Sequence, residues 1–179
     1  MKGRYYENDK ILDSGCGSGR NMHWFLLNGF NIFGIDINEE AITKLVTENP
    51  FLPKDRLQVS SVEKMPFPDN HFNHVLSCAV LHFAISTNHF IEMFAEMVRV
   101  VKQKGTLFIR MASDIGIENN VRLIGDGVYN IPDGSDRFLL SKSLLSNCMK
   151  KHNLSFIEPL KTVNVDDVRC MSTLVLRKN

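Results

Sequence analysis

The sequence predicts a doubly wound α/β fold: a mostly parallel sheet of seven strands that ends in an antiparallel hairpin. Short apolar runs alternate with segments of helical period, which is typical of a parallel sheet with helices on both faces. The first apolar run leads directly into a turn with three glycines. The last two extended runs are joined by Asp166-Asp167 alone, which is too short for a helical crossover, so these two strands must be antiparallel.

The apolar runs set the expected strands. The five parallel strands, in chain order, are Lys10–Ser14, Asn31–Asp36, Leu57–Ser60, Phe72–Ser77 and Gly105–Ala112. The hairpin is expected to consist of Leu154–Val165 and Val168–Leu176. A chain of 179 residues, 44% of them hydrophobic, has the size and core of one domain, so we expect residues 1–179 to form a single unit.

Three amphipathic helices are expected between the strands. Asn38 can cap the first, with Glu39 and Glu40 in its first turn. The second precedes the fifth strand and is expected to end at Gly105, and Ser141 can cap the third. Their apolar positions are Ala41, Ile42, Leu45 and Val46, then Phe90, Ile91, Phe94, Met97, Val98 and Val101, and finally Leu144, Leu145, Cys148 and Met149.

The composition bounds the class of protein. There are 21 Lys plus Arg against 20 Asp plus Glu, a net charge of +1, which gives no electrostatic reason to expect a nucleic acid or a membrane as partner. No apolar run reaches the length of a membrane span, and the first residues do not resemble a signal peptide. The four cysteines are scattered, so we expect free buried thiols and a cytoplasmic protein.

A glycine-rich turn follows the first strand. Within Ile11–Asn21, glycines at positions 15, 17 and 19 lie between a buried strand and a helix, where they let the backbone turn sharply and approach a ligand. The nicotinamide fingerprint needs its third glycine where this chain has Arg20. Asp13 would repel a pyrophosphate but could hold a cation such as the amino group of an amino acid. The alternative is a tight strand–helix turn without a ligand.

Asp36 ends the second strand, 23 positions after Asp13. A carboxylate at this place can accept hydrogen bonds from both hydroxyls of a ribose. By itself Asp36 could merely start the following helix. Together with the glycine turn it indicates a nucleoside cofactor.

These motifs resemble those of the class I S-adenosylmethionine (SAM)-dependent methyltransferases, a family with a Rossmann-like sheet, and especially the enzymes of ubiquinone and menaquinone biosynthesis. Asp13, with the glycines at 15, 17 and 19, matches the glycine-rich motif of the family, and Asp36 matches its ribose acid. The stretches that match its later motifs are Val59–Phe72, Leu76–Phe83 and Gly105–Met111. The terminal hairpin is also similar.

The resemblance implies SAM as cofactor. Asp13 and the glycine turn would hold its methionine part, Asp36 its ribose, and Ser61–Glu63 the edge of its adenine. The family usually has acids where this chain has Ser61 and Asn73, so adenine recognition would depend on the serine, the nearby backbone and apolar packing, and Asn73 is expected to be structural. The expected cofactor-binding residues are Asp13, Gly15, Cys16, Gly17, Gly19, Asn21, Asp36, Ile37, Ser61, Val62, Glu63 and Ser77.

The segments after the fourth and fifth strands would face a methyl acceptor. The expected acceptor-binding residues are His82, Phe83, Arg110, Tyr129 and Arg137. His82 has the pKa range of a general base, or else it is hydrogen-bonded into the start of a helix. Ser113–Arg137 is long for a connection in an α/β unit, and it is either a lid over the acceptor or a helix plus a solvated loop.

The resemblance implies methyl transfer to a small molecule. The alternative is a SAM-binding regulatory or partner-dependent subunit without catalysis. Few residues precede the first strand, so the helices that the family places over the active site are expected to be short or missing. A nucleophilic role for Cys78 is not expected, and neither is a metal site, because the histidines at 71, 74, 82 and 89 lack ligand spacing. The acceptor atom and the oligomeric state are not specified by this sequence.

Overall fold

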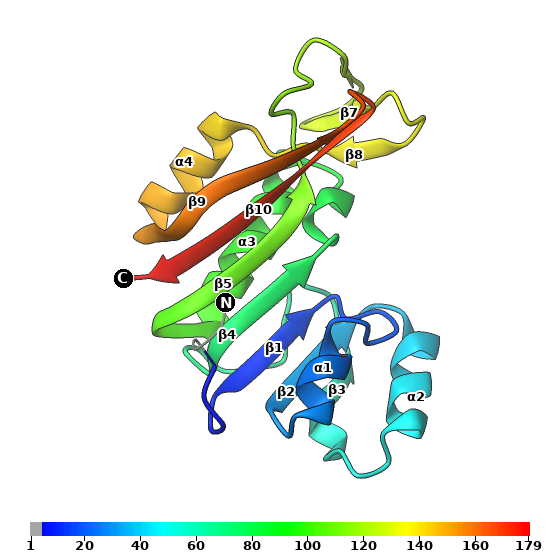
Figure 1. The fold of residues 1–179 in the computed structure, drawn as a ribbon, viewed down its shortest axis with the longest axis vertical. Coiled ribbons are helices and arrows are strands. Elements are labelled where there is room, and N and C mark those ends of the chain that lie inside the picture. Colours follow the sequence, from blue (N-terminus) through cyan, green and yellow to red (C-terminus); the bar gives the residue numbers. More distant parts are fainter. Residues whose placement is uncertain (1–4) are drawn as a thin grey trace.

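A computed structural model describes residues 5–179, and its centre is a seven-stranded sheet in the order β3-β2-β1-β4-β5-β10-β9 (Figure 1). The first five strands pair in parallel, and β10 is antiparallel to both β5 and β9. The predicted fold class is therefore confirmed. The strands are β1 (Lys10–Ser14), β2 (Asn31–Asp36), β3 (Leu57–Val59), β4 (Phe72–Cys78), β5 (Val101–Ala112), β9 (Leu154–Val165) and β10 (Arg169–Lys178).

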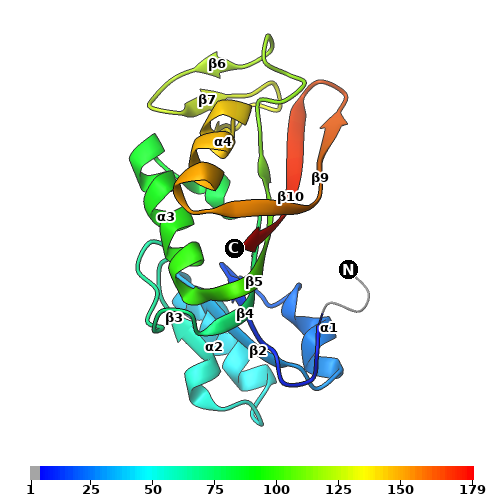
Figure 2. The ribbon, with the colours of Figure 1, turned by 90° about the vertical axis from the view of Figure 1, so that its left-hand side faces the viewer.

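Helices cover both faces of this sheet, as the alternating sequence pattern predicts. In Figure 2, α3 and α4 lie on the opposite side of the sheet from α1. Buried side chains of α1 and α2 share one apolar cluster, and those of α3 and α4 share a second, larger one. The helices are α1 (Met22–Leu27), α2 (Glu39–Glu48), α3 (Thr87–Val100) and α4 (Lys142–Lys151), with short 3₁₀ turns at η1 (Lys54–Arg56) and η2 (Leu81–Phe83). No helix in residues 5–179 is both long and apolar enough to cross a membrane.

Two predicted helix caps are confirmed. The side chain of Asn38 accepts a hydrogen bond from the backbone N–H of Ala41 at 3.1 Å, and that of Ser141 accepts one from Leu144 at 3.2 Å. The predicted apolar face of α2 is only half right, because Val46 is 38% exposed.

The predicted end of α3 at Gly105 was wrong, because the helix ends at Val100. The carbonyl groups of Arg99 and Val100 accept hydrogen bonds from the backbone N–H groups of Asn70 and His71, at 2.9 and 2.8 Å. Val101 has extended backbone angles and pairs with Phe72 on β4. Tertiary pairing therefore draws the chain out of the helix four residues before the glycine.

The C-terminal hairpin is antiparallel, as predicted, and the geometry of its turn explains how so short a segment can connect β9 to β10. Asp166 and Asp167 both have positive φ, 50° and 55°. Two consecutive left-handed residues are the signature of a type I′ turn, which matches the twist of the flanking strands, and aspartate tolerates this conformation better than most residues.

The segment 113–137 forms neither a helix nor an open loop. It contributes to a small antiparallel sheet of β6 (Arg122–Leu123), β7 (Val128–Asn130) and β8 (Asp136–Phe138), beyond the carboxyl ends of β4 and β5 (Figure 1). The ring of Phe138 is 1% exposed and stacks on Phe90 with 4.9 Å between ring centroids. Asp126 accepts a hydrogen bond from the Thr87 hydroxyl at 2.7 Å, next to the start of α3. Of the two alternatives, a helix plus a solvated loop is wrong, and a lid over the acceptor stays a prediction.

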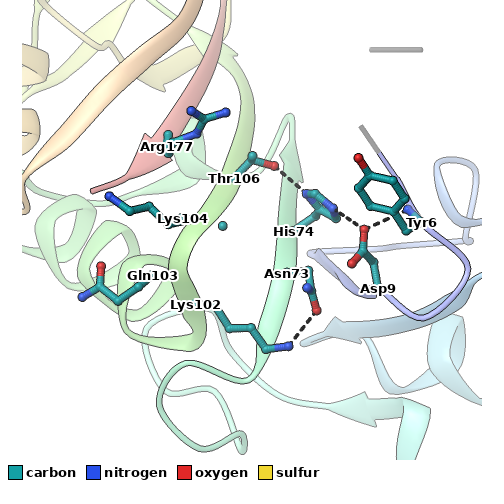
Figure 3. A pocket seen from close by; sticks show the side chains of 10 residues that line it. Tyr6, Asp9, Asn73, His74, Lys102, Gln103, Lys104, Thr106 and Arg177 are labelled. Carbon is teal, nitrogen blue, oxygen red and sulfur yellow. Dashed lines mark hydrogen bonds and ion pairs between the residues drawn. The ribbon is translucent and has the colours of Figure 1, made fainter. Parts of the chain in front are cut away.

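A cavity of about 440 Å³ lies at the opposite ends of the central strands, beside the amino ends of β1 and β4 (Figure 3). There His74 bridges Asp9 at 3.0 Å and the hydroxyl of Thr106 at 2.7 Å. Asn73 accepts hydrogen bonds from the backbone N–H of Lys10 and from the ammonium of Lys102. These contacts tie the start of β1 to β4 and β5, which gives Asn73 the structural role expected of it.

Candidate active site

The glycine turn after β1 lies where the strand order reverses, which is the usual place of a ligand in an open α/β sheet. Its three glycines have φ of +81°, +50° and +78°, so each needs a conformation that other residues rarely adopt. A Cβ on Gly15 would meet Val80, and one on Gly19 would meet Leu45. A Cβ on Gly17 would meet nothing within 4 Å. Gly15 and Gly19 therefore permit close packing within the protein, whereas Gly17 faces open space.

Asp36, at the end of β2, is half-buried and holds the turn in place. One of its carboxylate oxygens accepts the backbone N–H of Gly17 at 2.8 Å, and the other accepts that of Asn38 at 2.9 Å. Each carboxylate oxygen can accept a second hydrogen bond. The carboxylate can therefore bind two hydroxyls while it continues to fix the glycine turn.

Asp13 is fully buried, and neither of its carboxylate oxygens has a hydrogen-bond partner within the described residues 5–179. Burial raises the pKa of this carboxyl to about 7, and the negative charge of Asp36 adds to the rise. The amide of Asn21, which begins α1 without capping it, lies near enough to lower this pKa somewhat but not in hydrogen-bonding geometry. A buried acid without a partner costs stability unless a ligand supplies one, and a cation is the partner it favours.

A cavity of about 430 Å³ opens beside the glycine turn. Among its walls are seven of the predicted cofactor residues, namely Gly15, Gly17, Asp36, Ile37, Ser61, Val62 and Glu63. Five further residues complete the wall: Ala79, Val80, Phe83, His89 and Met93. The volume lies in the range of small-molecule sites, and the wall combines apolar side chains with a few polar groups, as such sites do.

The remaining predicted cofactor residues lie outside this wall. Cys16 is 5% exposed and packs in the apolar core under α1, where burial raises the pKa of its thiol to about 12. Ser77 is 1% exposed, and its hydroxyl has no hydrogen-bond partner among the described residues. Asp13, Gly19 and Asn21 line no part of the cavity.

His82 lies in η2 and is 7% exposed. Its Nδ1 accepts the backbone N–H of Ala112 at 3.2 Å, so the ring links the end of β4 to the end of β5. Burial, followed by the positive charges of Arg137 and Arg110, lowers the pKa of His82 to about 4. A neutral imidazole of such low basicity is a poor general base, and its contact with the backbone favours the hydrogen-bonded alternative.

Four of the five predicted acceptor residues lie together. Phe83 lines the cofactor cavity, and the guanidinium of Arg137 lies over its ring at 5.1 Å from the centroid. His82, Arg110 and Arg137 line an adjoining cavity of about 230 Å³. Tyr129 pairs with Arg137 between β7 and β8 and lines another hollow on the small sheet.

The structure adds Asp133 and Arg169 to the smaller cavity, and the sequence motifs had indicated neither. Arg169 begins β10, and the pairing of Met171 with Ala112 brings it to the end of β5. Only the strand register, which the sequence did not fix, could have revealed this neighbour. Ala79 lines both cavities and has φ of +63°, an unusual conformation for alanine that places it at their junction.

Comparison with known proteins agrees with a nucleoside cofactor at this switch point. The chain matches the methyltransferase domain family over residues 12–109, more than half of its length. It is 33% identical over 116 residues to the ubiquinone/menaquinone biosynthesis C-methyltransferase UbiE of Neisseria meningitidis, a match that covers 61% of this chain and 45% of that protein. The chain thus spans about half the length of that relative.

Two solved structures share the fold. A SAM-dependent methyltransferase of Methanosarcina mazei has a TM-score of 0.76 at 19% identity, over 98% of this chain and 94% of that one. The 1,6-didemethyltoxoflavin-N1-methyltransferase of Burkholderia thailandensis was solved with S-adenosylhomocysteine. It has a TM-score of 0.71 at 16% identity, and the match covers 96% of this chain and 71% of that one. The chain belongs to the class I SAM-dependent methyltransferases, a family whose cofactor is SAM.

Proposed function

We propose that this chain transfers the methyl group of SAM to a small-molecule acceptor. The observation that carries the proposal is the pair of adjoining cavities at the switch point of the sheet. The cavity of about 430 Å³ is lined by the Asp36 carboxylate and by Gly17, and the cavity of about 230 Å³ adjoins it at Ala79, which lines both. A cofactor in one and an acceptor in the other would be next to each other.

The chain's own residues supply three separate contacts for the cofactor. The Asp13 carboxylate would attract the amino group of the methionine part through the groups that separate it from the cavity. Asp36 would accept the two ribose hydroxyls. The backbone around Val62, the Ser61 hydroxyl and the apolar side chains of Ile37 and Met93 would surround the adenine.

Methyl transfer needs little acid–base help from the protein. Bound SAM supplies a methyl group already activated by the sulfonium, so the protein's task is to hold the acceptor atom in line with it. Ala79 lines both cavities, and Phe83 lines the larger one with the guanidinium of Arg137 over its ring. His82 acts as a support that joins β4 to β5, through its bond to Ala112.

A small acceptor fits the volume of about 230 Å³ in the second cavity, and the net charge of +1 gives no electrostatic reason to expect a nucleic acid. Among the similar proteins, UbiE is named for ubiquinone and menaquinone biosynthesis, and the Burkholderia enzyme was solved with its small heterocyclic substrate. We also propose a cytoplasmic location, which the four free cysteines support.

Calorimetry with SAM and with NAD tests the cofactor, and we expect binding of SAM alone. Transfer of labelled methyl groups to a metabolite panel then tests the activity. Binding of SAM without turnover on any acceptor would support a non-catalytic SAM-binding subunit and contradict the proposed enzyme.

A further inference from the structure

The smaller cavity is strongly basic. Three arginines line it, and they reach it from distant parts of the chain: Arg110 from β5, Arg137 from β8 and Arg169 from the start of β10. The sheet brings these elements together at the carboxyl ends of β4 and β5, beneath the small sheet (Figure 1). Such convergence of three guanidinium groups on about 230 Å³ needs a compensating charge.

The protein provides only part of that charge. Asp133 is the one acidic residue in the wall, so the three arginines leave an excess of two positive charges. Within residues 5–179, none of the three guanidinium groups forms a salt bridge within 4.0 Å. Asp133 itself accepts hydrogen bonds from the backbone and hydroxyl of Ser135, at 2.9 and 2.6 Å.

The neighbouring groups add no negative charge. His82 is neutral, because burial and the arginines keep its pKa low. The other side chains of the wall are apolar: Ala79, Ala112, Ile131 and Met171. Arg137 is held over the ring of Phe83 and donates to the carbonyl of Asp136 at 2.7 Å, so its guanidinium is positioned before any ligand arrives.

We propose that the methyl acceptor is a small organic anion, and that Arg110, Arg137 and Arg169 bind its carboxylate or phosphate group. This inference rests on the proposed function, because the arginine cavity is the acceptor site only if the adjoining cavity holds SAM. Arginine suits this task, since its planar fork can donate two parallel hydrogen bonds to either kind of anion. The anionic group fixes the acceptor at the border formed by Ala79 and Phe83, with its nucleophilic atom directed at the cofactor.

The test measures anion binding separately from cofactor binding. S-adenosylhomocysteine is first titrated into the wild-type protein by calorimetry. Benzoate, phenyl phosphate and the neutral benzamide are then titrated with and without that cofactor, while the Nε–Hε resonances of the arginines are followed by NMR. We expect saturable binding of at least one of the two anions, at least tenfold tighter than benzamide, and the comparison of benzoate with phenyl phosphate shows which anion the site prefers.

Arginine variants locate the site. Arg110→Gln and Arg169→Gln should each weaken binding of the preferred anion about tenfold or more, and Arg110→Lys should restore part of it. Arg122→Gln, on β6 of the small sheet but outside the cavity, is the matched control and should bind like the wild type. The affinity for S-adenosylhomocysteine should be unchanged in all four variants.

Three results would overturn the proposal. One is binding of both anions no tighter than that of benzamide, and another is no saturable binding of either anion below about 50 mM. The third is a loss of S-adenosylhomocysteine affinity in the arginine variants, which would assign the cavity to the cofactor. Failure of the proposed function is recognised separately, since the wild-type protein would then either bind no S-adenosylhomocysteine or bind SAM without turnover on any acceptor.

Discussion

Replacing Asp13 by Asn should make the free protein more stable and a poorer binder of its cofactor. The two side chains have nearly the same shape, so the change removes a buried charge without opening a cavity. Asp13 is fully buried and lacks a hydrogen-bond partner in the described chain, and its pKa of about 7 means that it is ionised above neutral pH at a cost.

The size of the gain follows from the pKa. A rise from 3.8 to about 7 is roughly three units, or about 4 kcal/mol of unfolding free energy lost above pH 7. An unpaired buried amide costs about 1–3 kcal/mol, so we expect a net gain of about 1–3 kcal/mol at pH 8. For a chain of this size that is a rise in Tm of about 2–12 °C.

The unfolding free energy that Asp13→Asn gains over the wild type should increase with pH. Because the folded-state pKa of Asp13 is raised, the contribution of this carboxyl to stability is favourable below pH 4 and is lost as pH rises through about 7. The variant should therefore be less stable than the wild type by about 1–3 kcal/mol below pH 4, where only the cost of the unpaired amide remains, and the difference should change sign and reach the full gain above pH 7. Urea unfolding at a series of pH values measures it.

Cofactor binding provides the second measurement. An ammonium group near Asp13 favours the ionised carboxyl, so the wild-type protein should release up to one proton on binding SAM near pH 6.5. Calorimetry in buffers of different ionisation enthalpy detects this proton, and Asp13→Asn should bind more weakly without releasing it. A difference in stability that does not vary between pH 4 and 8 would refute the buried-charge argument.

Three further predictions concern the same site. Asp36→Ala should weaken SAM binding by about 1.5–3 kcal/mol, the usual contribution of hydrogen bonds to a charged group, and unchanged affinity in calorimetry would remove its ribose assignment. Gly17→Val should leave a folded domain, because a Cβ there meets nothing within 4 Å, yet nearly abolish SAM binding, since it fills the ligand's space at a φ of +50°. The segment 113–137 should gain hydrogen-exchange protection when cofactor and acceptor bind, and Arg137→Ala should then lower acceptor affinity but not SAM affinity. Equal protection in all states would make this segment ordinary scaffold.

The strands and helix caps could be predicted because local chemistry determines them. The apolar runs ending at Ser14 and Asp36 are the full lengths of β1 and β2, and Asn38 and Ser141 cap helices through short-range hydrogen bonds. The end of α3 could not be predicted, since it depends on the pairing of Val101 with Phe72. That contact is between distant residues, and no local pattern encodes it.

The cofactor side of the site was largely predictable, and the acceptor side was only partly so. Glycine spacing and a strand-end acid are sequence motifs, and the structure brings seven of those residues into one wall. The acceptor cavity depends on how β8 and β10 are placed against β5. Arg169 therefore went unnoticed, and the role of Tyr129, which pairs with Arg137 but lines a neighbouring hollow, stays a prediction.

The position of β10 between β5 and β9 has a consequence for synthesis on the ribosome. The last strand to be made is an interior strand of the sheet, so β9 has no partner in the main sheet until the C-terminal residues emerge. The glycine turn and Asp36 belong to strands that can pair much earlier. The part of the sheet that carries the glycine turn and Asp36 can thus pair during translation, while the arginine cavity, which needs Arg169, closes only after β10 has been made.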